Sequence, residues 1–250
     1  MKKIKKIINK KNKSIIVCLT AYSKNIAQEV DKYADIVLVG DSLGSVLYNY
    51  STTRKVSLTE MINHSKSVKL GVKKSLMVVD MPFNTYNTNS NALKNAKKIL
   101  KETKCDAIKL EGGKRIISQI NILIKNKIPV MGHLGLLPQT TKGKFKSKGK
   151  TLKEKKQLID DAILLQKSGV FAIVLECVKT TLAKEITKKI KIPTIGIGSS
   201  VHCDGQVLVT DDLIGLNDTK IKFVKKFINI KKYLNIGLKK FSSEVKSKKC

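Results

Sequence analysis

The sequence predicts an α/β protein built as a single-domain (β/α)₈ (TIM) barrel. Short apolar runs recur along the chain, and polar stretches with helical spacing separate them. This alternation is typical of parallel βαβ units. The runs are continuously apolar, as is typical of strands buried on both faces. Eight such units would average about 31 residues each, which suits a barrel of this kind.

The strands are expected, in chain order, within residues 14–21, 35–42, 75–82, 107–113, 129–136, 172–177, 193–198 and 206–210. The clearest helical stretches are 58–70, 90–103, 152–168 and 180–190. A weak internal repeat supports this register, because Lys-Ile-Pro at 127–129 returns at 191–193, two units later. A doubly wound open sheet is the alternative, but no Gly-x-Gly-x-x-Gly turn opens a helix.

Charge and hydropathy divide the chain further. We expect a basic N-terminal extension at 1–13, the catalytic barrel at 14–222, and a basic C-terminal helix and tail at 223–250. No apolar run approaches the ~18–20 residues of a membrane span. The lysine-rich start followed by an apolar stretch imitates a signal peptide but is equally typical of a buried strand. A cytoplasmic protein is therefore expected.

The composition disfavours two functional classes. The formal net charge is +31, from 50 basic and 19 acidic residues, which first suggests a nucleic-acid partner. Only Arg54 and Arg115 are arginines, aromatic residues are 5%, and tryptophan is absent, so the means of base readout and stacking are scarce. We expect no specific nucleic-acid partner. Five widely spaced cysteines also exclude a disulfide scaffold.

Polar residues stand where successive predicted strands end. Because parallel strands of a barrel open on one face, their end residues converge on one mouth, where the active site of such a fold lies. Each has a structural alternative: a strand-end Asp caps a helix, and a lone His packs in a core. Together they predict a site. The residues are Asp41, Asp80, Lys109, Glu111, His133 and Glu176.

Three of these acids suit a magnesium ion. Asp41, Asp80 and Glu111 supply hard oxygen ligands, with no cysteine or histidine pair nearby. Lys109 lies two residues before Glu111, so it points to the same side of its strand and could face an anionic substrate. We interpret His133 as a pocket residue, not as the base.

Eight short strings, in order, resemble the ketopantoate hydroxymethyltransferase family. The resemblance runs from about residue 14 to 216 and leaves out only the lysine-rich ends. The strings are Leu-Thr-Ala-Tyr at 19–22, Val-Gly-Asp-Ser-Leu-Gly at 39–44, Asp-Met-Pro-Phe at 80–83, Lys-Leu-Glu-Gly-Gly at 109–113, Met-Gly-His-Leu-Gly-Leu-Leu-Pro-Gln at 131–139, Leu-Glu-Cys-Val at 175–178, Ile-Pro-Thr-Ile-Gly-Ile-Gly at 192–198 and Cys-Asp-Gly-Gln-Val at 203–207.

The resemblance implies a Mg²⁺-dependent transferase of pantothenate biosynthesis. A hydroxymethyl group would pass from 5,10-methylenetetrahydrofolate to 3-methyl-2-oxobutanoate through a Mg-stabilised enolate, giving 2-dehydropantoate. The resemblance assigns the metal to Asp41, Asp80 and Glu111, and makes Glu176 the proton acceptor. It assigns the oxo-acid contacts to Asp41, Ser42, Asp80 and Lys109. It also implies a homo-oligomer, often a homodecamer.

Two other functions stay open at this point. One is a related Mg-dependent α-keto-acid lyase or mutase barrel, although no Lys-Cys-Gly-His string is present. The other is a catalytically decayed, basic polyanion-binding protein.

The segment 142–150 has a lysine at every second position, and we expect it to meet the anionic glutamate tail of the folate.

Overall fold

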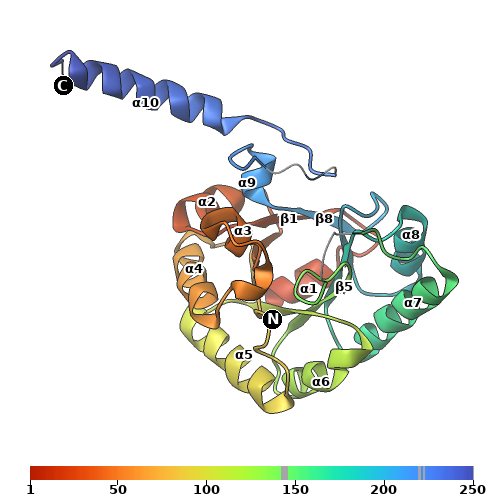
Figure 1. Cartoon of the computed structure of the whole chain (residues 1–250). Helices are drawn as coiled ribbons and strands as arrows, with labels where there is room; N and C mark the ends of the chain where they lie inside the picture. Colours follow the sequence, from red (N-terminus) through yellow and green to blue (C-terminus); the bar gives the residue numbers. More distant parts are fainter. Residues whose placement is uncertain (142–145, 219–220, 222, 250) are drawn as a thin grey trace. The chain divides into compact units, whose positions relative to one another are not determined.

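The computed structural model describes residues 1–141, 146–218, 221 and 223–249. Eight parallel strands, β1 to β8 in chain order, form a closed barrel. The (β/α)₈ prediction is thus confirmed, and the open-sheet alternative is wrong. The chain divides into two compact units, Met1–Val207 and Leu208–Cys250. In the first unit the helices ring the strands (Figure 1).

All eight strands fall within or next to the expected ranges. They are β1 (Ile16–Thr20), β2 (Ile36–Val39), β3 (Leu76–Asp80), β4 (Ala107–Glu111), β5 (Val130–Gly135), β6 (Ala172–Glu176), β7 (Thr194–Ile197) and β8 (Gly205–Leu208). The α-helices are α1 (Lys2–Ile8), α2 (Lys24–Val30), α3 (Leu43–Tyr48), α4 (Leu58–Gly71), α5 (Asn89–Thr103), α6 (Ile117–Lys125), α7 (Leu152–Lys167), α8 (Thr180–Lys189), α9 (Thr210–Leu213) and α10 (Ile230–Lys246), with short 3₁₀ turns η1 (Thr53–Lys55) and η2 (Lys114–Ile116).

Polar side chains start several of these helices where the sequence changes from turn to helix. Ser57 accepts the Glu60 backbone N–H and Glu60 accepts the Ser57 N–H, a capping box at α4. Thr88 and Thr151 cap α5 and α7 in the same position. These caps explain why the predicted ranges of these helices agree closely with the observed ones.

The two sides of the barrel strands pack into two separate apolar cores. In β3, Leu76 and Val78 pack in the cluster inside the barrel, whereas Met77 and Val79 pack in the cluster under the helices. Side chains alternate along a strand, so Asp80 continues the inward row. The same alternation sends Lys109 and Glu111 of β4, His133 of β5 and Glu176 of β6 inward. The strand register therefore fixes which polar residues enter the barrel.

Helix α1 closes the end of the barrel at which the strands begin. Ile7 is buried among the apolar residues of the barrel interior. The Lys11 ammonium lies 2.8 Å from the Asp204 carboxylate just before β8, and both side chains are nearly buried. Lys3 donates to the Ser75 carbonyl, just before β3. The basic N-terminal extension at 1–13 therefore contributes to the barrel core.

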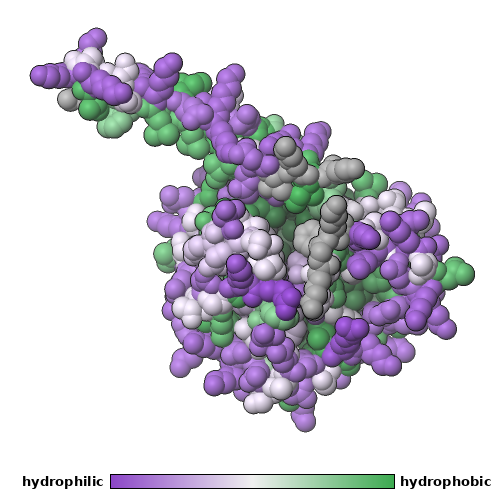
Figure 2. Space-filling view, in the orientation of Figure 1, coloured by the Kyte–Doolittle hydropathy of each residue, from purple (hydrophilic) through white to green (hydrophobic). Residues whose placement is uncertain are grey.

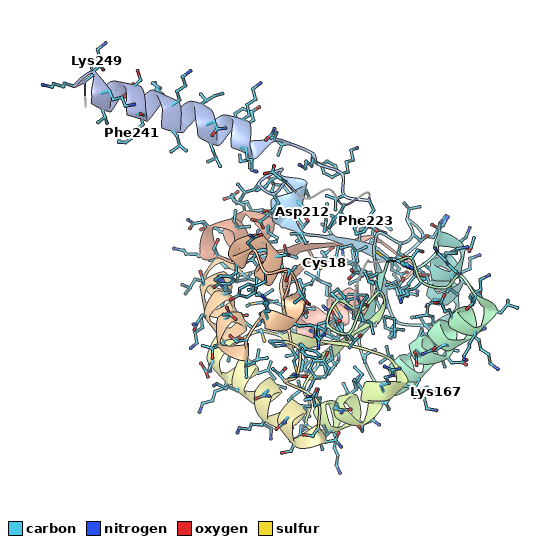
Figure 3. All side chains as sticks on the ribbon, viewed as in Figure 1. Cys18, Lys167, Asp212, Phe223, Phe241 and Lys249 are labelled. Carbon is cyan, nitrogen blue, oxygen red and sulfur yellow. The ribbon has the colours of Figure 1, made fainter. Side chains whose placement is uncertain are left out.

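The second unit holds the two last helices. Its longer helix, α10, has no buried residue among its 17 residues, all of which the structure describes. Apolar side chains such as Phe241, labelled in Figure 3, are exposed along it. Among the described residues, no helix is long and apolar enough to cross a membrane.

Hydrophilic residues cover most of the face seen in Figure 2 and do not gather in a single patch. Exposed lysines such as Lys167, at the end of α7, belong to this cover (Figure 3).

Candidate active site at the carboxyl ends of the strands

Six strand-end residues meet at one mouth of the barrel, as the sequence predicted. Asp80, Glu111 and Glu176 are the last residues of β3, β4 and β6, and Asp41 follows β2 by two residues. The parallel register places Asp80 beside Lys109 and Glu111 beside His133. All but Glu176 are at most 5% exposed. The Glu176 side chain is 17% exposed and is the one that reaches toward solvent.

Asp41 and Asp80 form the first half of the site. The Asp41 backbone N–H donates to Asp80 Oδ2 at 3.1 Å. Gly40 precedes Asp41, and a Cβ there would stand 2.9 Å from the Ser42 hydroxyl, so a larger residue would require the Ser42 side chain to shift. Burial, together with the facing carboxylates, raises the pKa of Asp41 well above its usual range. The pair therefore favours a compensating cation.

Lys109 supplies one such cation. Its ammonium lies 3.1 Å from Asp80 Oδ1. Burial opposes the charged ammonium, but Asp80 and the other carboxylates outweigh burial and raise the pKa of Lys109. Burial nevertheless raises the pKa of Asp80 even beside this ammonium. The single positive charge of Lys109 thus does not balance the negative charges of the acids around it.

His133 connects the other two acids. Its Nδ1 lies 3.4 Å from Glu111 Oε1 and its Nε2 lies 3.2 Å from Glu176 Oε2. Burial and Lys109 lower the pKa of His133, yet Glu111 and Glu176 outweigh them and raise it to about 9. Burial raises the pKa of Glu111, but the facing imidazolium and Lys109 lower it more. The imidazole thus lies between Glu176 and Glu111.

Local backbone geometry sets the position of Glu176. Gly135, at the end of β5, has φ +98°, and a Cβ there would lie 2.2 Å from the Glu176 carbonyl oxygen. Cys177, directly after Glu176, has φ +50°, a left-handed conformation that is uncommon outside glycine. The Lys148 N–H donates to the Cys177 carbonyl at 2.8 Å. Lys148, near the end of the lysine-rich segment, is therefore held beside the residue that follows Glu176.

Ser42 stands at the rim of the site. Its hydroxyl lies 2.8 Å from the Tyr22 hydroxyl, and its side chain is half-buried at the start of α3. Tyr22 was not singled out in the sequence, although it belongs to the Leu-Thr-Ala-Tyr string. Of the predicted lysine segment, Lys142 and Lys144 lie outside the described residues.

Sequence reasoning also missed Gln139. This glutamine is 1% exposed and donates its side-chain amide to Asp41 Oδ2 at 2.8 Å. Its backbone N–H donates to Glu111 Oε2 at 3.0 Å. It lies in a loop after β5, so no strand-end pattern could indicate it. Its only sequence signal is its place at the end of the 131–139 string.

The donor set fits magnesium. Asp80 Oδ1 is buried and accepts no hydrogen bond, although Lys109 is near it. Asp41, Asp80 and Glu111 provide oxygen donors only, which Mg²⁺ prefers. Among the described residues, no three His, Cys, Asp or Glu side chains already form a group that could hold a metal ion. Magnesium needs no such cage, because it keeps several waters and binds through one or two carboxylates together with its substrate.

The chain matches the family model described as ketopantoate hydroxymethyltransferase over residues 1–250. It is 65% identical over 244 residues to the 3-methyl-2-oxobutanoate hydroxymethyltransferase of Pelagibacter ubique (strain HTCC1062), covering 98% of this chain and 95% of that protein. It is 48% identical to the protein of the same name from Rhizobium etli, covering 94% of this chain and 87% of that one.

Solved structures with a similar fold have very different sequences. Phosphoenolpyruvate phosphomutase from Streptomyces platensis subsp. rosaceus has a TM-score of 0.65 at 8% identity, covering 98% of this chain and 87% of that one. A phosphonopyruvate hydrolase in complex with oxalate and Mg²⁺ has a TM-score of 0.62 at 10% identity, covering 84% and 81%. At such identities the likeness concerns the fold alone.

Proposed function

The chain belongs to the ketopantoate hydroxymethyltransferase family, and from this premise we propose that it converts 3-methyl-2-oxobutanoate to 2-dehydropantoate with 5,10-methylenetetrahydrofolate. One observation carries the proposal. Acids suited to a metal, a buried lysine and a separate, partly exposed glutamate face one mouth of the barrel. A positioned base and positive charge beside the developing enolate oxygen both promote the removal of a proton next to a keto group.

We propose that Asp41, Asp80 and Glu111 hold Mg²⁺ directly or through its waters. When bound, the ion would draw electron density from the keto and carboxylate oxygens of the substrate. Lys109, kept charged by the surrounding acids, would contact the same anionic substrate. Asp41, Ser42 and Asp80 would complete the oxo-acid contacts. In this assignment the most buried charged residues bind the metal and orient the substrate.

Glu176 is proposed as the base. Its Oε2 lies beside His133 Nε2, whereas Glu111 lies beside Nδ1 on the other side of the ring. Glu176 therefore stands apart from Asp41, Asp80 and Glu111, the proposed metal ligands. Its carboxylate would take the proton from C3 of the oxo acid. C3 would then form a carbon–carbon bond with the methylene carbon of 5,10-methylenetetrahydrofolate. This bond replaces one of the two C–N bonds of the methylene carbon, and a C–O bond replaces the other. One water is consumed, since it supplies the hydroxyl oxygen of the product.

The folate tail is proposed to meet the lysine-rich segment. Lys146, Lys148 and Lys150 are described, and Lys148 is held beside the residue that follows Glu176. Lysine-to-serine changes across 142–150 should raise the KM for polyglutamylated folate more than the KM for the monoglutamate. Equal effects on the two folates would contradict this role.

The competing interpretations are less well supported. The likeness to lyase and mutase structures rests on 6–10% identity, whereas relatives at 65% and 48% identity carry the transferase name. A decayed enzyme would not be expected to keep six ionisable residues linked by successive contacts at one mouth of the barrel. The homodecamer and the cytoplasmic location stay predictions.

The direct test of the proposed function is product formation. The purified protein with Mg²⁺, oxo acid and methylenetetrahydrofolate should yield 2-dehydropantoate, detected by mass spectrometry, and omission of either substrate should abolish it. Glu176→Gln should lower kcat about 10²–10⁴-fold, the usual contribution of a positioned base. Glu185→Gln, an exposed glutamate of α8, is the matched control and should behave as wild type. Product formation that is unchanged in Glu176→Gln would contradict the assignment.

A further inference from the structure

Gln139 contacts more of the site than any other uncharged residue described above. Its side-chain nitrogen donates to Asp41 Oδ2 at 2.8 Å and to the Met81 carbonyl at 2.9 Å. Its side-chain oxygen accepts from the Tyr86 hydroxyl. Its backbone N–H donates to Glu111 Oε2 at 3.0 Å. One buried loop residue thus touches two carboxylates, one just after β2 and one at the end of β4.

The orientation of this amide is fixed by its neighbours. A backbone carbonyl can only accept, so the NH₂ group must face Met81. The carbonyl oxygen of Gln139 then faces Tyr86, whose hydroxyl must donate. Burial and the nearby Glu111 carboxylate raise the pKa of Tyr86, so the phenol keeps its proton. Both amide hydrogens and the amide oxygen are used, and a flipped amide would place two acceptors face to face at Met81.

This arrangement acts on the carboxylates that are proposed to hold the metal. Because Oδ2 of Asp41 accepts the amide hydrogen, Oδ1 is the oxygen left for another partner. In Glu111 the Gln139 N–H donates to Oε2 and His133 faces Oε1, so these two residues set the orientation of the carboxylate. Hydrogen bonds from outside a metal's own ligands orient those ligands, and losing one typically weakens metal binding 10–100-fold.

We propose that Gln139 is a positioning residue that orients Asp41 and Glu111 for the divalent cation, and that Tyr86 fixes its amide. This role rests on the proposed function, because it assumes the metal carboxylates assigned there. Gln139 touches no reacting atom in this account. It acts through the two carboxylates, so its removal should change metal affinity before it changes the chemistry of the bound substrate.

The test is metal binding without substrate. Mn²⁺ prefers the same oxygen ligands and can be titrated by electron paramagnetic resonance. Gln139→Met keeps the length of the side chain and removes the side-chain amide that donates to Asp41, whereas the backbone N–H that donates to Glu111 stays. The variant should bind Mn²⁺ about 10–100-fold more weakly than wild type. Tyr86→Phe removes one oxygen and should give a smaller loss in the same direction. In steady-state assays, the Mg²⁺ concentration for half-maximal rate should rise more than kcat falls.

A matched control separates positioning from general packing. Gln119 is also buried, and its amide donates to the Asn87 carbonyl at 3.2 Å, with no contact to the site carboxylates. Gln119→Met should therefore bind Mn²⁺ as wild type does. Folding of each variant is checked by circular dichroism, and if Gln139→Met does not fold, Tyr86→Phe carries the test.

Three results would overturn the proposal: a folded Gln139→Met with wild-type Mn²⁺ affinity, a Tyr86→Phe with wild-type affinity where it carries the test, or an equal loss in Gln119→Met. The failure of the proposed function is distinguishable, because it would show as a wild type that binds Mn²⁺ and forms no product.

Discussion

Gly135 has no side chain and lies against Glu176, the proposed base. Its φ of +98° and the 2.2 Å distance from an added Cβ to the Glu176 carbonyl oxygen both exclude a larger residue. The Leu136 N–H donates to the same carbonyl at 2.8 Å. Any side chain at 135 must therefore displace the end of β6.

Gly135→Ala should consequently lower both stability and activity. The strained backbone costs about 1–3 kcal/mol, and a shift of about 1 Å in a catalytic group costs on the order of 10²-fold in rate. Urea denaturation and kcat measure the two effects. Gly237→Ala in α10 is the control, since no atom lies within 4 Å of its added Cβ. An active, stable Gly135→Ala would contradict this account of how Glu176 is placed.

At the same scale, the site residues differ in how far the sequence could predict them. Asp80, Glu111 and Glu176 end apolar runs, so their convergence follows from parallel strands alone. Gln139 and Tyr86 come from loops, whose path depends on tertiary contacts that no local pattern encodes. Their contacts with Asp41 and with each other become visible only in the folded chain.

At the scale of elements, Asp31 holds the connection between α4 and β3. Its carboxylate accepts the backbone N–H groups of Lys73, Lys74 and Ser75. Burial raises the pKa of Asp31, but these three hydrogen bonds outweigh it and hold the pKa below its ordinary value of 3.8. The ionised form therefore stabilises the folded state.

The sign of the pH dependence follows from this lowered pKa. The contribution of Asp31 is fully present above about pH 4 and is lost as the pH falls through the folded pKa. Asp31→Asn should cost about 1–3 kcal/mol at pH 7, and the difference from wild type should shrink toward pH 3. Thermal unfolding across this range measures it, with the exposed Asp160→Asn as control. A difference that is constant with pH would contradict the interpretation.

The strands were more predictable than the helices for a physical reason. A strand buried on both faces has a continuous apolar run, which the sequence displays directly. Short helices such as α2 and α3 bury few residues and have no comparable signal. The N-terminal extension shows the same limit, because its lysines conceal Ile7, which is buried inside the barrel.

At the scale of the whole molecule, the net charge of +31 is the dominant feature. Like charges repel one another more in the compact state than in the unfolded chain. The Debye length falls to about 8 Å at physiological ionic strength, so salt screens most of this repulsion. Electrostatics therefore sets part of the stability without setting the fold.

The unfolding temperature should accordingly rise with ionic strength. Each kcal/mol of screened repulsion corresponds to about 2–4 °C for a chain of this size. Differential scanning calorimetry in increasing sodium chloride measures the rise, and sodium fluoride should give the same curve because screening depends on ionic strength alone. An unfolding temperature that falls in both salts would show that favourable ion pairs outweigh the net repulsion.

We propose that this barrel mouth removes the C3 proton of an α-keto acid, with Glu176 as the base. Proton NMR of 3-methyl-2-oxobutanoate in D₂O, with protein and Mg²⁺, tests it most directly. We predict that the C3–H signal disappears with wild type, and that Glu176→Gln or removal of Mg²⁺ abolishes the exchange. If the wild type gives no exchange even with folate present, or if Glu176→Gln exchanges equally fast, the claim is contradicted.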